Sequence, residues 1–326
     1  MINMKKILDA RLGLHILELE ITSRCNLNCQ HCYNRTGKNV DMPLRQIKKL
    51  YDFAGKNKIW TFIISGGEAL LHPNFSRILD ILQKKPKNLR LVLQSNGELI
   101  SEKIFSDLKI FDWVHLSFDL SKEIRHNGWK NLELAKALKR HGIKAYLFAT
   151  IHNKNKNDLD KMIEVARKNS IPIGFNLCMS AAHLDKKLVM TKKNFMLMEK
   201  KLFKLNKQKI ILRYSSPLVS ILDESKRGEF KGIEGGCTAG IAACVVAPNG
   251  DVYPCPFFRI KAGNINEKSL KSIWLKSDLL NIVRDREGYD QPCSDCDRLS
   301  YCGGCRNRAY QENNNLRASD PMCYKF

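Results

Sequence analysis

The twelve cysteines of this 326-residue sequence are the residues best suited to chemistry. The first three, Cys25, Cys29 and Cys32, follow a short segment with strand periodicity. Thiolates at such spacings hold iron–sulfur clusters. Eight more lie near the other end of the chain, at Cys237, Cys244, Cys255, Cys293, Cys296, Cys302, Cys305 and Cys323.

The number of cysteines in each group separates two kinds of site. Three thiolates on a cluster of four irons leave one iron without a protein ligand, so a substrate can bind there. Four thiolates close a cluster, which then carries electrons or stabilises the fold. We therefore expect one open cluster at Cys25, Cys29 and Cys32, and two closed clusters in the C-terminal region.

The composition is that of a globular protein large enough for one α/β domain and a smaller module. Hydrophobic residues make up 44% of the chain, and no apolar run approaches the ~18–20 residues that span a bilayer. No secretion signal precedes Leu14, so we expect a cytoplasmic protein that does not interact with membranes. In a reducing compartment, this many cysteines indicate metal or redox chemistry rather than disulfides.

The formal net charge of +22 is large, although three clusters with their thiolates would remove roughly five units of it. Paired lysines along the expected helices are explained by solvated helix faces, or by attraction for an acidic peptide or nucleic acid. No basic run is interleaved with aromatic residues, which argues against nucleic acid.

Segments with strand character alternate with helical periodicity through the first two-thirds of the chain. Six such units predict parallel strands with right-handed crossovers, as in a partial barrel or an open doubly wound sheet. A ligand binds at the carboxyl ends of the strands in either fold. The strands are expected at residues 16–21, 60–64, 89–93, 113–118, 144–151 and 171–177, with helices after Pro43 and Pro73, from Trp129, around Ile163 and after Thr191.

The character of the sequence changes after about Ser215, and glycine and cysteine are frequent from Lys231 onward. We therefore expect one domain at residues 1–215 and a metal-organised module at residues 216–326. Within that module, residues 248–251 read as a hairpin turn.

The run Cys25-x3-Cys29-x2-Cys32, followed by Tyr33 and by a Gly-Gly-Glu segment after the next strand, resembles the radical S-adenosylmethionine (SAM) family. This resemblance implies a partial (β/α)6 TIM-like barrel and a 4Fe-4S cluster whose open iron binds SAM. Reduction of the cluster, by a donor such as flavodoxin or ferredoxin, would release a 5′-deoxyadenosyl radical that takes a hydrogen atom from the substrate.

The same resemblance implies contacts with SAM. Gly66 and Gly67 lack a Cβ, so their backbone can approach the methionine ammonium, where Glu68 would add charge. Asn96 lies in the polar turn beneath the cofactor, and Tyr33 lies beside adenine.

Three further residues match the segments that contact the ribose in this family. Ser117 and Asp119 follow the fourth expected strand, and Asn153 follows the fifth as a weaker match. Each of the three is equally well explained as an ordinary hydrogen-bonding residue at the end of a strand.

The C-terminal cysteines, with Gly250 five residues before Cys255, resemble the SPASM domain of radical SAM enzymes. By this resemblance, one set of thiolates holds an inner auxiliary cluster and another set holds an outer one. Structural zinc is the rival interpretation, because Cys-x2-Cys pairs also suit zinc. The inner set would be Cys237, Cys244, Cys255 and Cys305, and the outer set Cys293, Cys296, Cys302 and Cys323.

Cys178 remains after this assignment. A buried cysteine is usually a small apolar residue. At the end of the sixth strand, its thiol could instead donate a hydrogen atom to a substrate radical, as a cysteine does in peptide epimerases of this superfamily.

Enzymes that resemble this combination modify ribosomally made peptides by crosslinking, epimerisation or oxidation. We expect a peptide substrate with an acidic segment that suits the basic chain, which either a separate leader-peptide-binding protein delivers or the enzyme binds directly. Pro256 stands where sulfatase-maturing enzymes have Asp, which counts against that branch. The alternatives are oxidation or decarboxylation of a small molecule, such as a tetrapyrrole or a cyclitol, and a zinc-stabilised nucleic-acid-binding protein.

Overall fold

The computed structural model describes residues 13–34, 37–120, 128–179, 184–210, 213–214, 216–222, 236–299 and 301–326. Six parallel strands curve around a common centre, each paired with the next in chain order. This arrangement confirms the predicted partial (β/α)6 barrel. The strands are β1 (Ile16–Glu20), β2 (Thr61–Ser65), β3 (Arg90–Ser95), β4 (Trp113–Ser117), β5 (Ala145–Ile151) and β6 (Ile173–Leu177), and a short β7 (Arg213–Tyr214) pairs with β6.

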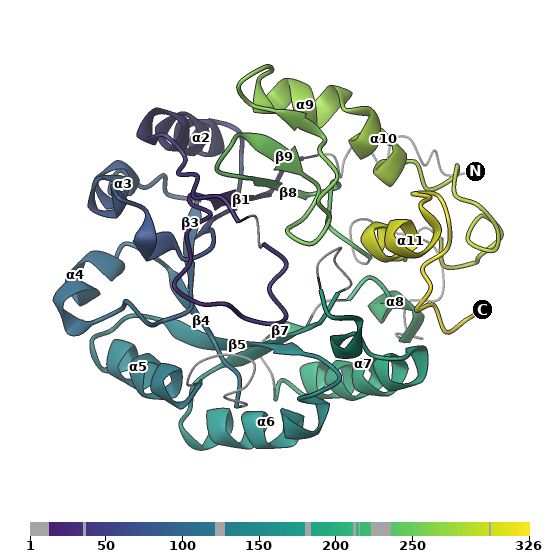
Figure 1. Ribbon diagram of the computed structural model, residues 1–326, viewed down its shortest axis with the longest axis horizontal. Helices are drawn as coiled ribbons and strands as arrows, with labels where there is room; N and C mark the ends of the chain where they lie inside the picture. The colour runs from purple at the N-terminus through teal and green to yellow at the C-terminus, as the bar shows by residue number, and fades with distance from the viewer. Residues whose placement is uncertain are drawn as a thin grey trace.

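Helices form the outer layer of the barrel (Figure 1). Two of these helices end in residues typical of helix caps: the Thr191 hydroxyl accepts a hydrogen bond from Asn194 N at 3.4 Å, and Gly142 follows a helix with φ +76°. The sequence did not predict the four-residue α4, which is too short to show a helical period. The helices are α2 (Leu44–Lys56), α3 (Phe75–Leu82), α4 (Phe105–Leu108), α5 (Gly128–Arg140), α6 (Leu159–Lys168) and α7 (Lys192–Lys207).

The main hydrophobic core lies between the sheet and these helices. Strand residues alternate between its two faces, so Leu17 and Leu19 pack into this core. Glu18 and Glu20, on the other face of β1, are buried toward the inside of the barrel. Two acidic side chains in a buried strand mark the barrel interior as a polar site.

The C-terminal region continues the same sheet instead of standing apart from it. Strand β8 (Ala243–Val246) pairs in parallel with β1, and β9 (Asp251–Tyr253) and β10 (Gly263–Asn264) follow at that edge. The predicted hairpin turn joins β8 to β9, with Gly250 at φ +88°. The boundary at 215/216 remains a prediction, because residue 215 lies outside the described residues.

The remaining helices belong to this region and are short. Two of them, α9 and α10, lie outside β8 and β9, and α11 lies on the side of α8 (Figure 1). None of the helices in the described parts of the chain is both long and apolar enough to cross a bilayer. Their bounds are α8 (Val219–Leu222), α9 (Leu270–Lys276), α10 (Asp278–Arg284) and α11 (Arg306–Asn313).

A buried amide on α5 ties together the carboxyl ends of two strands. Asn131 Nδ2 donates to the backbone oxygen of Asn96 at 2.8 Å and to that of Ser117 at 2.6 Å. Gly97 lies against it, because a Cβ at that position would meet Asn131 Oδ1 at 2.1 Å. The side chain thus fixes the loops after β3 and β4 relative to each other.

We expect Asn131→Ala to lower the free energy of unfolding by about 1–3 kcal/mol, since it leaves two buried carbonyl oxygens without their donor. Denaturant titration followed by circular dichroism measures this change. Lys136→Ala, at a partly exposed position of the same helix, is the matched control and should change stability by less than about 0.5 kcal/mol. Equal stabilities of the two variants would contradict the bridging role of Asn131.

Candidate functional site

The loop after β1 holds Cys25, Cys29 and Cys32 at the carboxyl end of the barrel. Burial raises the pKa of the Cys25 thiol, and the charges of Glu68, Cys29 and Cys32 add to the rise, while the Leu27 backbone N–H opposes it. The three thiols therefore lie close enough to act on one another. Across the described parts of the chain, no three Cys, His, Asp or Glu side chains converge as the ligands of one metal ion would.

Gly66 and Gly67 pack against the backbone that leads into this loop. A Cβ on Gly66 would lie 2.4 Å from Thr22 O, and one on Gly67 would lie 2.3 Å from Arg24 O. The backbone nitrogen of Gly67 donates to Thr22 O at 2.8 Å, and that of Glu68 donates to Arg24 O at 2.7 Å. The missing Cβ atoms thus allow the segment after β2 to hold the cysteine loop in place. The contact of these glycines with the SAM ammonium stays a prediction.

Glu68 links the ends of β2 and β3 and is only 1% exposed. Its Oε2 accepts a hydrogen bond from Asn96 N at 2.7 Å, and its Oε1 accepts one from the Ser95 hydroxyl at 3.0 Å. Asn96 in turn donates to Asn26 Oδ1 at 2.8 Å, and its Nδ2 lies 4.0 Å from Cys25 Sγ. The structure therefore brings Glu68 and Asn96 to the cysteine loop, as the sequence predicted for the site.

Asp119 is buried after β4 and faces the same loop. Its Oδ2 lies 4.0 Å from His31 Nε2, and its Oδ1 accepts a hydrogen bond from Asn155 Nδ2 at 3.2 Å. Sequence reasoning missed Asn155, although it follows β5 by only four residues. Next to it, burial lowers the pKa of His152 to about 4, so this ring is neutral near pH 7.

Among the described residues, no side-chain hydrogen bond joins Ser117 or Asn153 to the cysteine loop, so the structure supports their place in the site less strongly than that of Asp119. The backbone oxygen of Ser117 accepts a hydrogen bond from the side-chain amide of Asn131. Asn153 Oδ1 accepts a hydrogen bond from Lys156 Nζ at 2.7 Å, and its backbone N donates to Leu188 O at 2.9 Å. Both residues are half-buried near the strand ends, and their contacts with a ribose remain predictions.

Tyr33 joins the cysteine loop to the C-terminal region. Its ring meets Phe257 edge-on at 4.9 Å between centroids, and the Arg259 guanidinium lies 5.2 Å from the same ring. Arg259 also forms an ion pair with Glu20 of β1, with Nη1 at 3.0 Å from Oε2. The sequence signal for this pair was a glutamate within a buried strand, which requires a cation nearby.

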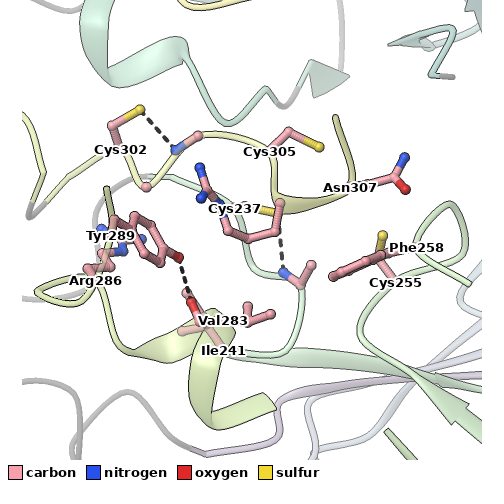
Figure 2. Close-up of a pocket in the computed structure, with 14 residues that line it drawn as sticks. Cys237, Ile241, Cys255, Phe258, Val283, Arg286, Tyr289, Cys302, Cys305 and Asn307 are labelled. Atoms are coloured by element: carbon pink, nitrogen blue, oxygen red, sulfur yellow. Dashed lines mark hydrogen bonds between the residues drawn. The ribbon is translucent and has the colours of Figure 1, made fainter. Parts of the chain in front are cut away.

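A second group of thiols lies in the C-terminal region (Figure 2). Cys237, Cys255 and Cys305 line a pocket there, and Cys302 also borders it. Burial raises the pKa of Cys237 to about 11, and Cys305 adds to the rise. Cys305 is the N-cap residue of α11.

The structure does not place Cys244 with these three thiols. Cys244 lies in β8 opposite Leu17 of β1, is 1% exposed and belongs to the main hydrophobic core. Burial raises its pKa to about 12, and among the described residues Arg284 is the one charge that acts on it. The predicted role of Cys244 as fourth ligand of the inner cluster therefore has no support in this arrangement.

The other four C-terminal cysteines form a separate group around Cys323. Cys302 and Cys293 both act electrostatically on Cys323, and Cys296 acts on Cys293. Burial raises the pKa of Cys302 to about 11. Two groups oppose this rise: the backbone N–H of Gly304, which donates to Cys302 Sγ at 3.2 Å, and the charge of Arg286. The structure therefore brings these four cysteines together, and their role as the ligands of an outer cluster stays a prediction.

Buried arginines surround both C-terminal groups. Five guanidinium groups are buried among the described residues of this region, against one buried acid, Asp320. Arg306 Nε and Nη2 and Arg298 Nη1 are buried without a hydrogen-bond partner. Iron–sulfur clusters with their thiolates carry negative charge, so the side chains present fit such clusters. The five arginines are Arg284, Arg286, Arg298, Arg306 and Arg308.

Cys178 is 6% exposed and packs with Leu184 and Leu188 in a small cluster between β6 and α7. Burial raises the pKa of its thiol to about 12. The thiol therefore keeps its hydrogen at neutral pH. The next residue, Met179, accepts a contact from Arg308 Nη1 at 3.3 Å, which connects this loop to the C-terminal region.

Asp320 holds the C-terminal region together through Arg308. Arg308 Nε lies 2.8 Å from Asp320 Oδ1, and Asp320 Oδ2 accepts a hydrogen bond from Cys305 N at 2.8 Å. Burial by itself would raise the pKa of Asp320, but the charge and hydrogen bonds of Arg308 hold it below its usual range. The carboxylate therefore stabilises the fold above its unfolded pKa, and this contribution is lost as pH falls through the lower folded pKa.

We expect Asp320→Asn to destabilise the protein by about 3–5 kcal/mol at neutral pH, because it leaves the Arg308 charge buried and unpaired. Asp297→Asn is the matched control, since Asp297 pairs with Lys325 at the surface, where solvent screening leaves an ion pair with little effect on stability. Denaturant titrations at neutral and acidic pH measure both effects. A cost for Asp320→Asn that does not shrink at acidic pH would contradict the charged role of Asp320.

Two family models match this chain. The radical SAM superfamily model matches residues 19–166, and the SPASM model, described as an iron–sulfur cluster-binding domain, matches residues 237–297.

The chain is similar to a heme synthase and to a bacteriocin biosynthesis protein. The AdoMet-dependent heme synthase of Methanosarcina barkeri is 23% identical over 94% of this chain and 95% of its own. The subtilosin biosynthesis protein AlbA of Bacillus subtilis is 27% identical over 90% of this chain and 67% of its own.

The fold is shared with solved structures. Streptococcus suis SuiB bound to its precursor peptide SuiA superposes with a TM-score of 0.81 at 17% identity, over 98% of this chain and 79% of SuiB. The enzyme anSMEcpe with bound AdoMet and a peptide gives 0.72 at 20% identity, over 94% of each chain. These matches agree with the cysteine loop and the barrel described above. The chain is therefore a radical SAM enzyme with a C-terminal SPASM domain.

Proposed function

We propose that this enzyme abstracts a hydrogen atom from a peptide and so produces a crosslink, an epimerised residue or an oxidised side chain. The observation that carries the proposal is the placement of Cys25, Cys29 and Cys32 beside Glu68 and Asn96, at the carboxyl ends of parallel strands. A 4Fe-4S cluster and SAM, when bound there, supply a 5′-deoxyadenosyl radical.

The residues of the chain hold and orient these groups. The three thiolates hold the cluster, and the loop that carries them is fixed by Gly66 and Gly67. Glu68 and Asn96 lie where they can orient the amino acid part of SAM, and Asp119 lies where it can orient the ribose. Tyr33, packed on Phe257 and Arg259, covers this loop and helps to exclude water.

The proposal includes two auxiliary 4Fe-4S clusters, and so three clusters in all. Cys237, Cys255 and Cys305 hold the inner one. Buried arginines stabilise the thiolates, since Arg286 lowers the pKa of both Cys237 and Cys302. When bound, these clusters would accept an electron from an oxidised substrate, and a flavodoxin or ferredoxin would supply the electron that starts each turnover. The outer cluster is held by Cys293, Cys296, Cys302 and Cys323.

A peptide substrate is supported by the relative AlbA, whose name assigns it to bacteriocin biosynthesis. The net charge of +22 favours a peptide with an acidic segment. A separate leader-peptide-binding protein would deliver it. Cys178 is proposed as the hydrogen donor if the outcome is epimerisation, because its protonated thiol has a hydrogen atom to give.

A small-molecule substrate is the second candidate. It is favoured by the match to the heme synthase of Methanosarcina barkeri, which extends over 95% of that protein. A tetrapyrrole carries propionate side chains whose oxidation or decarboxylation begins with loss of a hydrogen atom. The basic charge of the chain suits this substrate too, so charge does not separate the two candidates.

We expect the triple variant Cys25→Ala/Cys29→Ala/Cys32→Ala to lose about four irons per chain and all release of 5′-deoxyadenosine from SAM. Anaerobic reconstitution, iron analysis and chromatography of the nucleoside products measure both. The Cys178→Ala variant is the control and should retain its full iron content. Release of 5′-deoxyadenosine by the triple variant would exclude the proposed site.

A second experiment tests whether the substrate is a peptide. The enzyme is co-expressed with a short peptide encoded beside its gene, and the peptide is then examined by mass spectrometry. Loss of two hydrogen atoms indicates a crosslink or dehydrogenation. Deuterium uptake at a stereocentre indicates epimerisation, which Cys178→Ala should then abolish while it still forms 5′-deoxyadenosine. An unchanged peptide, together with decarboxylation of a tetrapyrrole by the same enzyme, would favour the second candidate.

A further inference from the structure

We infer that this chain binds the inner auxiliary cluster with three thiolates only, so that one of its irons is open to an anionic ligand from outside the chain, a thiolate in particular. The inference rests on the proposed presence of that cluster. It replaces the closed inner site that the cysteine count suggested, and it gives the enzyme a second open iron besides the one at Cys25, Cys29 and Cys32.

The geometry of β8 removes Cys244 from the inner site. Opposite residues in a paired strand point to the same side of the sheet. Cys244 is opposite Leu17, which packs into the core beneath the helices, whereas Val245 is opposite Glu18 on the inner side of the barrel. Cys244 is therefore packed in the core, and it is not among the described residues that line the pocket of Cys237, Cys255 and Cys305.

The remaining cysteines do not supply the missing ligand. All twelve cysteines lie in the described residues. Cys302 reaches the edge of the inner pocket, but its Sγ donates to Pro217 O at 3.5 Å and accepts from Gly304 N at 3.2 Å. It also acts electrostatically on Cys323, which places it in the outer group.

The pocket itself favours an anion. The described residues that line it include no His, Asp or Glu. Arg286 and Arg306 line it, and Arg306 presents two buried nitrogens, Nε and Nη2, that have no hydrogen-bond partner. Thiolates are the ligands that iron–sulfur clusters prefer. A thiolate on the fourth iron would both complete the cluster and approach the Arg306 charge.

Two single variants test which thiols hold the cluster. We expect Cys237→Ala to lose about four irons per chain after reconstitution, and Cys244→Val, which keeps an apolar side chain in the core, to lose none. Loss of about four irons from both variants would overturn the inference while leaving the proposed auxiliary cluster in place. No loss from Cys237→Ala would instead remove the inner cluster, and with it the cluster count of the proposed function.

Isotopically labelled cyanide tests the open iron directly. The background is Cys25→Ala/Cys29→Ala/Cys32→Ala, which lacks the first open iron and retains the C-terminal clusters. In the reduced state of this protein, we expect hyperfine coupling from the label in pulsed electron paramagnetic resonance, and its loss on adding excess β-mercaptoethanol. Adding Cys237→Ala should also abolish the coupling. Absence of coupling in the background variant would mean that the iron is closed, and would overturn the inference.

Discussion

The C-terminal region depends on negative charge at its cysteines. It buries five guanidinium groups and one carboxylate, Asp320, among its described residues. A buried cation without a partner is costly, and several of these nitrogens have none. Thiolates that hold iron–sulfur clusters provide the missing charge. Folding of this region and loading of its clusters are therefore expected to be coupled, with Asp320 placing Arg308 beside Cys305.

The second constraint is the parallel pairing of β8 with β1. β1 precedes the loop with Cys25, and β8 precedes the hairpin that leads to Cys255, so one strand pair positions both cysteine groups. The pairing also brings Arg259 to Glu20 and lets it pack on Tyr33. The two regions thus share a sheet, an ion pair and an aromatic contact. A radical formed at the barrel mouth would lie next to the region that holds the auxiliary clusters.

Much of the barrel could be predicted because its signals are local. Each expected strand begins and ends within two residues of the observed one, since alternation of apolar residues and strand length are visible in the chain itself. The cap at Thr191 and the turn at Gly250 were predictable for the same reason. The pairing of β8 with β1 was not, because no local pattern indicates which distant strand covers an exposed sheet edge.

The sequence by itself determined the chemistry: three cysteines at close spacing, a Gly-Gly-Glu segment after the next strand, and eight C-terminal cysteines in a recognisable order. Tertiary structure alone decided which thiols face one another. Cys244 stands between Cys237 and Cys255 in the chain, yet strand alternation directs its side chain into the core. The roles of Asn131, Asn155 and Arg259 were likewise decided by the fold. Their partners lie on other elements, and a hydrogen bond or ion pair between distant residues leaves no trace in spacing along the chain.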